Sequence, residues 1–157
     1  MNQVDIENPI INSGFHEPTR HFRFTDEGIT NEEVDRRRSS SYFVPIAKPK
    51  KKGARQLSID TEWTQDRINE NKLVNEIRCR VAMWRNDGYG GVTPTTERLL
   101  AYWTDPSREK KLVFCQNEAL ETAIYITEVA GKYGDAWIEN SIRAANDTSN
   151  PGLPRMV

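Results

Sequence analysis

The sequence is short of cysteine, of histidine and of long apolar runs, and each shortage excludes a class of protein. Its two cysteines, Cys79 and Cys115, lie far apart, which fits neither a disulfide framework nor the paired spacing of a zinc site. Its two histidines, His16 and His21, lack partners at ligand spacing, so no metal site is expected. We therefore expect a reduced, cytoplasmic protein.

A membrane partner is not expected either. No run approaches the roughly 18 apolar residues of a membrane-spanning helix. The polar start of the chain also lacks the basic and apolar blocks of a signal peptide.

The overall charge is balanced and says little about partners. The 22 basic and 23 acidic residues give a formal net charge of −1, so only local clusters can indicate nucleic acid. A chain of 157 residues can form one domain with a core, but only 36% of its residues are hydrophobic and 29% are charged. Part of the chain is therefore expected to lie outside that core.

Residues 1–60 are expected to form an extended, largely irregular arm, because prolines and glycines interrupt any long periodicity. Within it, residues 21–24 (HFRF) predict a short strand. Thr30 and Glu33 fit a capping box, which predicts a brief helix that continues into the arginines that follow. The apolar residues 39–46 are expected to be extended.

Two basic clusters in this arm flank an aromatic pair, Tyr42 and Phe43. Such cations can neutralise phosphates, and aromatic rings between them can stack on unpaired bases. A solvated charge run on a linker explains the clusters equally well. The candidate DNA-contacting residues are Arg36, Arg37, Arg38, Lys48, Lys50, Lys51 and Lys52.

Residues 61–147 are expected to form a helical domain, so the predicted fold class is mainly α. The first helix is predicted from apolar residues at helical spacing: Ile68, Leu73, Val74, Ile77, Val81 and Trp84. Thr93 before Pro94 predicts the capped start of a second helix. Asp135 predicts the start of another, which ends near Ala145. Residues 86–91 (NDGYGG) predict a turn, and residues 148–157 a linker and the start of a strand.

The most interpretable segment is residues 112–130, an apolar entry followed by a helix. Its buried face is predicted from residues that recur at three and four positions: Leu120, Ala123, Ile124 and Thr127. Three glutamates are expected to lie off that face: Glu118, Glu121 and Glu128. Gly131 is expected to close the helix in a left-handed conformation, with Lys132 at the negative end of the helix dipole.

Gln116 stands in the first turn of this helix, where its amide can donate and accept hydrogen bonds at once, as reading the edge of adenine requires. Phe114 is a candidate wall of the same base pocket. The pattern aromatic-x-Gln-x-Glu-Ala resembles the adenine-reading Q motif of superfamily 2 helicases and translocases. An ordinary capped helix start is the alternative.

The whole chain resembles the N-terminal region of large restriction-subunit-like proteins, relatives of type III restriction endonucleases that carry a superfamily 2 helicase core. The resemblance rests on residues 17–24 (EPTRHFRF), 40–46 (SSYFVPI), 60–63 (DTEW), 102–106 (YWTDP), 114–124 (FCQNEALETAI) and 150–155 (NPGLPR). It implies that a RecA-like α/β domain with a phosphate loop follows. It also implies that the full-length protein binds ATP with magnesium and DNA, with a methyltransferase subunit as a candidate partner.

The chain itself lacks the residues that such an enzyme needs for catalysis. The phosphate-binding string G-x-x-x-x-G-K-[ST] does not occur, and residues 88–91 (GYGG) have glycines without the lysine. Asp60 and Glu62 are paired carboxylates, but no Asp/Glu-x-Lys strand follows, so surface charge is the simpler interpretation. We expect no catalytic residue in this chain, and no bound cofactor or ATP hydrolysis when it is alone.

Two hypotheses follow. In the first, the chain is the N-terminal accessory part of an ATP-dependent DNA translocase with restriction activity, truncated just before the phosphate loop, and contributes adenine recognition and DNA contacts. In the second, it is a stand-alone helical module that binds DNA or a protein, or a truncated relic without catalysis.

Overall fold

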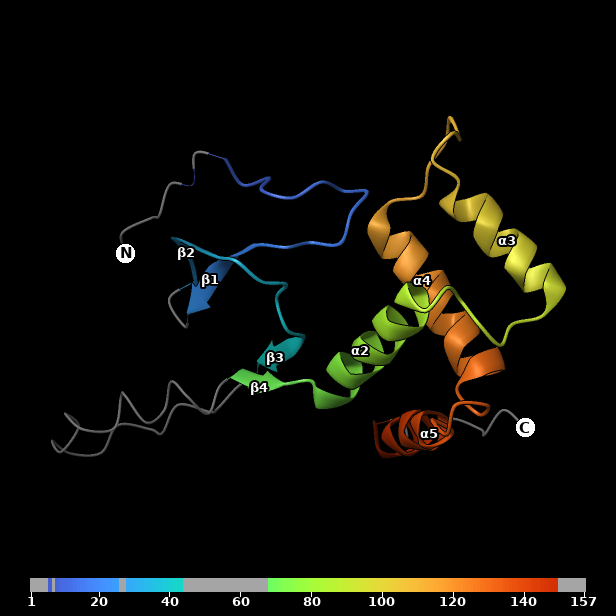
Figure 1. Cartoon of the computed structure of the whole chain (residues 1–157). Helices are drawn as coiled ribbons and strands as arrows, with labels where there is room; N and C mark the ends of the chain where they lie inside the picture. Colours follow the sequence, from blue (N-terminus) through green and yellow to red (C-terminus); the bar gives the residue numbers. More distant parts are fainter. Residues whose placement is uncertain (1–5, 7, 26–27, 44–67, 150–157) are drawn as a thin grey trace, which may run out of the picture. The chain divides into compact units, whose positions relative to one another are not determined.

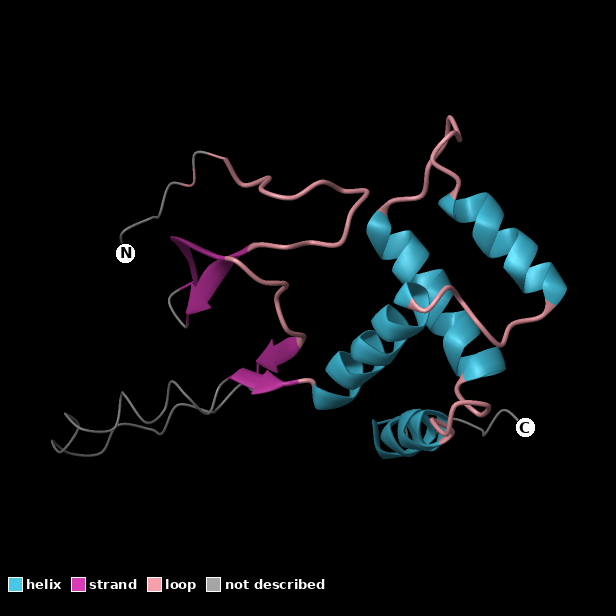
Figure 2. Ribbon diagram, viewed as in Figure 1, coloured by secondary structure: helices cyan, strands magenta, loops and turns pink. Residues whose placement is uncertain are grey.

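The computed structural model of the chain describes residues 6, 8–25, 28–43 and 68–149 (Figure 1). The chain divides into two compact units, Met1–Lys72 and Leu73–Val157. The first contains two small antiparallel sheets, and the second contains the helices (Figure 2). The predicted helical region is confirmed in outline, although the sheets make the chain as a whole a mixture of strands and helices.

The first unit is built from two antiparallel strand pairs. Strand β1 (His21–Thr25) pairs with β2 (Gly28–Val34), and the register shifts between Phe22 and Phe24. Strand β3 (Ser41–Phe43) pairs with β4 (Ile68–Glu70). The strand predicted over residues 21–24 is therefore confirmed, and part of the predicted extended segment 39–46 forms β3.

Two predictions in this unit are wrong. The brief helix expected from Thr30 is strand β2, because the Thr30 hydroxyl donates to the Arg23 carbonyl across the strand pair at 3.0 Å instead of capping a helix. Ile68 lies in strand β4, so the first helix begins later than predicted. In both places, pairing with another strand overrides a short local pattern.

The described residues of the second unit form four α-helices and one π-helical turn. The α-helices are α2 (Lys72–Asn86), α3 (Pro94–Thr104), α4 (Phe114–Ile124) and α5 (Trp137–Ser149). Helix α4 continues without a break into the π-helix η1 (Tyr125–Val129), where the Ala130 amide donates to the Tyr125 carbonyl at 2.7 Å. Helix α5 ends at Ser149, beyond the predicted end at Ala145, and residues 150–157 lie outside the described part of the chain.

The predicted start of α3 is confirmed, and a distant carboxylate reinforces it. Thr93 is the N-cap and accepts from the Thr96 amide at 3.3 Å, with Pro94 at the first helical position. Glu128 of η1 accepts from the Thr93 amide at 3.0 Å and from the Thr96 hydroxyl at 2.6 Å. The Thr96 hydroxyl above all, and then the Thr93 amide, hold the pKa of Glu128 below its usual range.

The turn predicted at residues 86–91 is also confirmed. Tyr89 adopts a left-handed φ of 60°, and the Trp84 indole donates to the Gly90 carbonyl at 2.8 Å. A Cβ atom on Gly90 would lie 2.9 Å from the Tyr133 hydroxyl, so a side chain larger than hydrogen would displace that tyrosine. The glycines therefore allow Tyr133 to pack on the turn.

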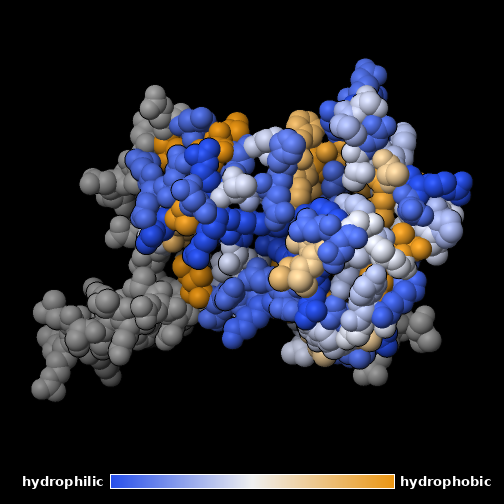
Figure 3. Space-filling view, viewed as in Figure 1, coloured by the Kyte–Doolittle hydropathy of each residue, from blue (hydrophilic) through white to orange (hydrophobic). Residues whose placement is uncertain are grey.

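One hydrophobic core holds the helices together. It consists of Ile77, Val81, Trp84, Leu100, Tyr125, Val129, Ala130 and Ile138. The visible face of the helical unit is largely hydrophilic, with small separate hydrophobic areas (Figure 3). The predicted left-handed residue after the central helix is wrong: Gly134, with a φ of 82°, adopts that conformation instead of Gly131.

Helix α5 provides a direct test of this core. Ile138 is 0% exposed, whereas Ile142, one turn further along the same helix, is 39% exposed. We expect Ile138→Ala to lower the free energy of unfolding by about 2–5 kcal/mol, because it leaves a cavity in the core. Ile142→Ala is the matched control, since it changes helix propensity equally and should cost much less. Urea unfolding with an unchanged m-value measures both, and equal losses would contradict this core.

Candidate functional site

Gln116 occupies the third position of α4 and is exposed. Its Oε1 accepts from the Val113 amide at 3.1 Å, and its own backbone amide donates to the Val113 carbonyl at 3.0 Å. This is one half of a capping box, because Val113 has no side-chain oxygen to complete the other half. The side-chain NH₂ group has no acceptor among the described residues. The capping bond therefore fixes the side-chain amide while leaving its donors available.

Phe114, the other predicted adenine contact, faces a different environment. It begins α4 and is partly buried, with the Arg85 guanidinium carbon 5.2 Å from its ring centroid. Helical positions two apart point to different sides, so the Phe114 ring and the Gln116 amide do not face each other.

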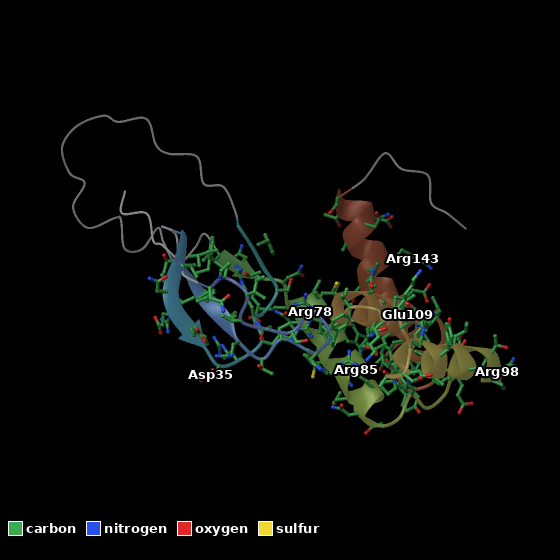
Figure 4. The ribbon with its side chains drawn as sticks, turned by 90° about the horizontal axis from the view of Figure 1, so that it is seen from above. Asp35, Arg78, Arg85, Arg98, Glu109 and Arg143 are labelled. Carbon is green, nitrogen blue, oxygen red and sulfur yellow. The ribbon has the colours of Figure 1, made fainter. Side chains whose placement is uncertain are left out.

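Behind Phe114 lies a network that the sequence analysis missed. Glu121 is 3% exposed, and its Oε2 accepts from Arg85 Nε at 2.9 Å and from Nη2 at 2.5 Å. Its Oε1 accepts from the Tyr89 hydroxyl at 2.7 Å. Arg85 lies on α2 (Figure 4), so the network joins α2, the turn after it and α4. Burial, followed by the bond to Glu121, raises the pKa of the Tyr89 hydroxyl.

The predicted buried face of the central helix is only partly right: Ile124 packs against the core and Leu120 is partly buried. Ala123 and Thr127 of that face are exposed, whereas Glu121, expected off it, is buried beside Tyr125 and Val129. The spacing of four between Glu121, Tyr125 and Val129 was visible in the sequence. The first residue of this series is a glutamate, so the sequence pattern did not indicate a buried face. Burial of a carboxylate depends on partners from elsewhere in the chain.

A second buried carboxylate lies near the start of α5. Asp135 is 4% exposed; its Oδ2 accepts from the Tyr125 hydroxyl at 2.5 Å, and its Oδ1 from the Trp137 indole at 3.1 Å. Arg80 Nη1 lies 3.5 Å from the same Oδ1. Asp135 does precede α5 as predicted, but its side chain accepts a hydrogen bond from the core residue Tyr125 and so links the turn before α5 to the core. Burial, followed by the Asp135 bond, raises the pKa of Tyr125 to about 12.

The predicted DNA-contacting residues belong to the first unit, and its arginines are only partly available. Arg37 forms an ion pair with Glu17 at 2.9 Å, and the Arg38 guanidinium carbon lies 5.1 Å from the Phe24 ring centroid. Arg36 is exposed, and its carbonyl accepts from His21 Nδ1 at 2.6 Å. The other predicted residues lie outside the described part of the chain: Lys48, Lys50, Lys51 and Lys52.

Other predicted features give no catalytic grouping. Within the described part of the chain, no group of three or more histidine, cysteine or acidic residues could hold a metal. Asp60 and Glu62 lie outside the described residues, and both cysteines are exposed and free. None of the helices in the described ranges is long and apolar enough to cross a bilayer. Comparison with models of protein families, with curated proteins and with solved structures finds no match.

The two tyrosine–carboxylate bonds predict how stability depends on pH. Tyr89 and Tyr125 have raised pKa values in the folded protein, that of Tyr125 about 12, against about 10 for an unfolded tyrosine. Their protonated hydroxyls therefore stabilise the fold fully below pH of about 10, and this stabilisation is lost as the pH rises from there towards about 12. We expect the free energy of unfolding to fall over this window.

Urea unfolding at a series of alkaline pH values measures this dependence. Tyr125→Phe removes one of the two hydroxyls whose pKa is raised in the folded protein, so the fall with pH should be shallower than in the unchanged protein. A slope that is the same in both proteins would contradict the assignment.

Proposed function

We propose that the helical unit supplies the adenine contact of an ATP-dependent DNA translocase with restriction activity, and that the arm contributes DNA contacts. The observation that supports this proposal is the state of Gln116. Its side chain is exposed at the start of α4, held by the Val113 amide and free to donate from its NH₂ group. The resemblance of the surrounding segment to a Q motif supports the same interpretation.

The chemistry of adenine fits this amide. Adenine presents an N6 donor beside an N7 acceptor, and a glutamine side chain can pair with both. Oε1 has a second lone pair after it accepts from Val113, and the NH₂ group supplies the donor. Guanine presents an acceptor, O6, in place of the N6 donor, so Gln116 should prefer ATP to GTP.

The sequence of the chain contains no G-x-x-x-x-G-K-[ST] string to hold the phosphates of the nucleotide. The Trp84 indole and the Tyr133 side chain contact the turn at residues 88–91. In the described residues 68–149, no helix begins directly after this turn, so it lacks the helix N-terminus that binds phosphates in a phosphate loop. An adenine contact alone does not position the terminal phosphate for attack by water, because positioning that phosphate requires a phosphate loop. ATP hydrolysis with magnesium therefore belongs to the full-length protein in this proposal, as does any pairing with a methyltransferase.

Two variants of Gln116 separate base reading from helix capping. Gln116→Glu keeps an oxygen that can accept from the Val113 amide but loses the NH₂ donors, whereas Gln116→Ala loses both. The chain alone is not expected to hold a cofactor stably, so ATP is added in excess, and its contact with the chain is expected to be weak, with a Kd on the order of 1 mM. Both variants should weaken ATP binding about fivefold to thirtyfold, because one or two hydrogen bonds of about 1 kcal/mol each are lost.

Titration with ATP, followed by the NMR shifts of the Gln116 side-chain amide in the unchanged chain and of the backbone amides at the start of α4 in all three isotope-labelled proteins, measures these affinities. GTP is the control ligand and should shift that amide less than ATP does. Equal responses to both nucleotides, or no response to either, would leave Gln116 with only the role of a helix-start residue.

The proposed binding of DNA by the arm generates a separate prediction. Replacement of the seven predicted basic residues of the arm by glutamine should weaken DNA binding for all sequences. It should also flatten the dependence on salt, by about 0.9 in the log–log slope for each phosphate that the arm no longer neutralises. The control is Arg143→Gln, because Arg143 is exposed and paired with Glu139 within α5. An unchanged slope in the arm variant would identify the clusters as a solvated linker.

A further inference from the structure

One part of the helical unit has no role in the proposed adenine contact. Residues 102–106 (YWTDP) belong to the resemblance to restriction-subunit-like proteins, and most of them have structural roles. Trp103 packs against the core, the Thr104 hydroxyl donates to the Leu100 carbonyl at 2.8 Å, and Asp105 Oδ1 accepts from the amide and hydroxyl of Ser107. Tyr102 is the exception, since it is 58% exposed.

An arginine is stacked on this exposed ring. The Arg108 guanidinium carbon lies 4.1 Å from the Tyr102 ring centroid, close enough for a cation–π contact. Arg108 Nη1 is buried and has no hydrogen-bond acceptor, which is true of no other buried side-chain nitrogen or oxygen in the described ranges. A charged donor of this kind is normally satisfied. Because this atom is buried, a ligand cannot reach it directly; what the pair presents at the surface is the Tyr102 ring with a positive charge stacked on it.

The surrounding basic residues form no ion pair with any described residue, although the charges of Arg108 and Lys111 act on the Asp105 carboxylate. Four basic residues over α3 and the loop after it form no ion pair within the described part of the chain: Arg98, Arg108, Lys110 and Lys111. Arg80, Arg85 and Arg143 of the same unit are paired, whereas Arg78 of α2 also forms no ion pair within the described residues. Arg98 precedes Tyr102 by one turn of α3, and Figure 4 shows it on that helix.

We infer that Tyr102 and Arg108, with Arg98, Lys110 and Lys111, form a contact site for single-stranded nucleic acid. An exposed ring beside unpaired cations is the combination that binds an unpaired strand without sequence preference, since bases stack on the ring and phosphates meet the cations. A duplex offers the same phosphates but keeps its bases stacked on each other. The site should therefore prefer a single strand, and it is distinct from the basic residues of the arm.

Fluorescence anisotropy of a labelled oligo-dT strand tests this site on the full chain. Tyr102→Leu should weaken binding about fivefold or more, because base stacking is lost. Tyr102→Phe keeps the ring and should bind as the unchanged chain does. Arg98→Gln with Arg108→Gln should lower the salt slope, whereas Arg143→Gln should not. Near-ultraviolet circular dichroism of each variant confirms that the exposed substitutions leave the core intact.

Three results would overturn the inference. They are equal binding by Tyr102→Leu and Tyr102→Phe, competition by heparin as strong as that by oligo-dT, and tighter binding of a duplex than of the single strand. The first two indicate a surface for polyanions in general. The arm variant with seven glutamines is a further comparison. If it loses single-strand binding while Tyr102→Leu in the otherwise unchanged chain has no effect, the contact belongs to the arm alone.

Discussion

Glu121 is a carboxylate buried among helices, and such a charge is stable only if cations and hydroxyl donors surround it. Arg85 and Tyr89 provide these partners, and both come from the end of α2 or the turn that follows it. Loss of one partner of a buried ion pair typically costs about 3–5 kcal/mol, because the other charge is left unpaired. The position of α4 against α2 therefore depends on this network.

The π-helical turn extends the same constraint along the central helix. Its wider winding keeps Tyr125 and Val129 in the core together with Ala130, the residue after the turn. Glu128 meanwhile reaches the first turn of α3, where it accepts from Thr93 and Thr96. Tyr125 also donates to Asp135 at the start of α5. One continuous helix, α4 with η1, thus contacts each of the other helices through polar groups as well as through the core.

This arrangement leaves two surfaces of the unit available for ligands. The first turn of α4 presents Gln116, whose orientation follows from the capping bond to Val113. The exposed side of α3 presents Tyr102, which the core does not use because Trp103 and Leu100 fill the buried side. Both surfaces belong to helices that the buried network holds in place. The proposed adenine contact and the inferred strand contact therefore lie on the same helical unit.

The sequence by itself determined the elements whose signals are local. The Thr93–Pro94 helix start, the turn at residues 86–91 and the strand at residues 21–24 depend on caps, glycines and alternation within a few residues, and all three are confirmed. Only the tertiary structure decided the rest. Whether Thr30 caps a helix or pairs in a sheet depends on Arg23 across the turn, and whether Glu121 is exposed or buried depends on Arg85, which is 36 residues away. Neither partner leaves a periodic signal in the sequence, and the free energy of burying the Glu121 charge is set by the groups that surround it rather than by its neighbours in the chain.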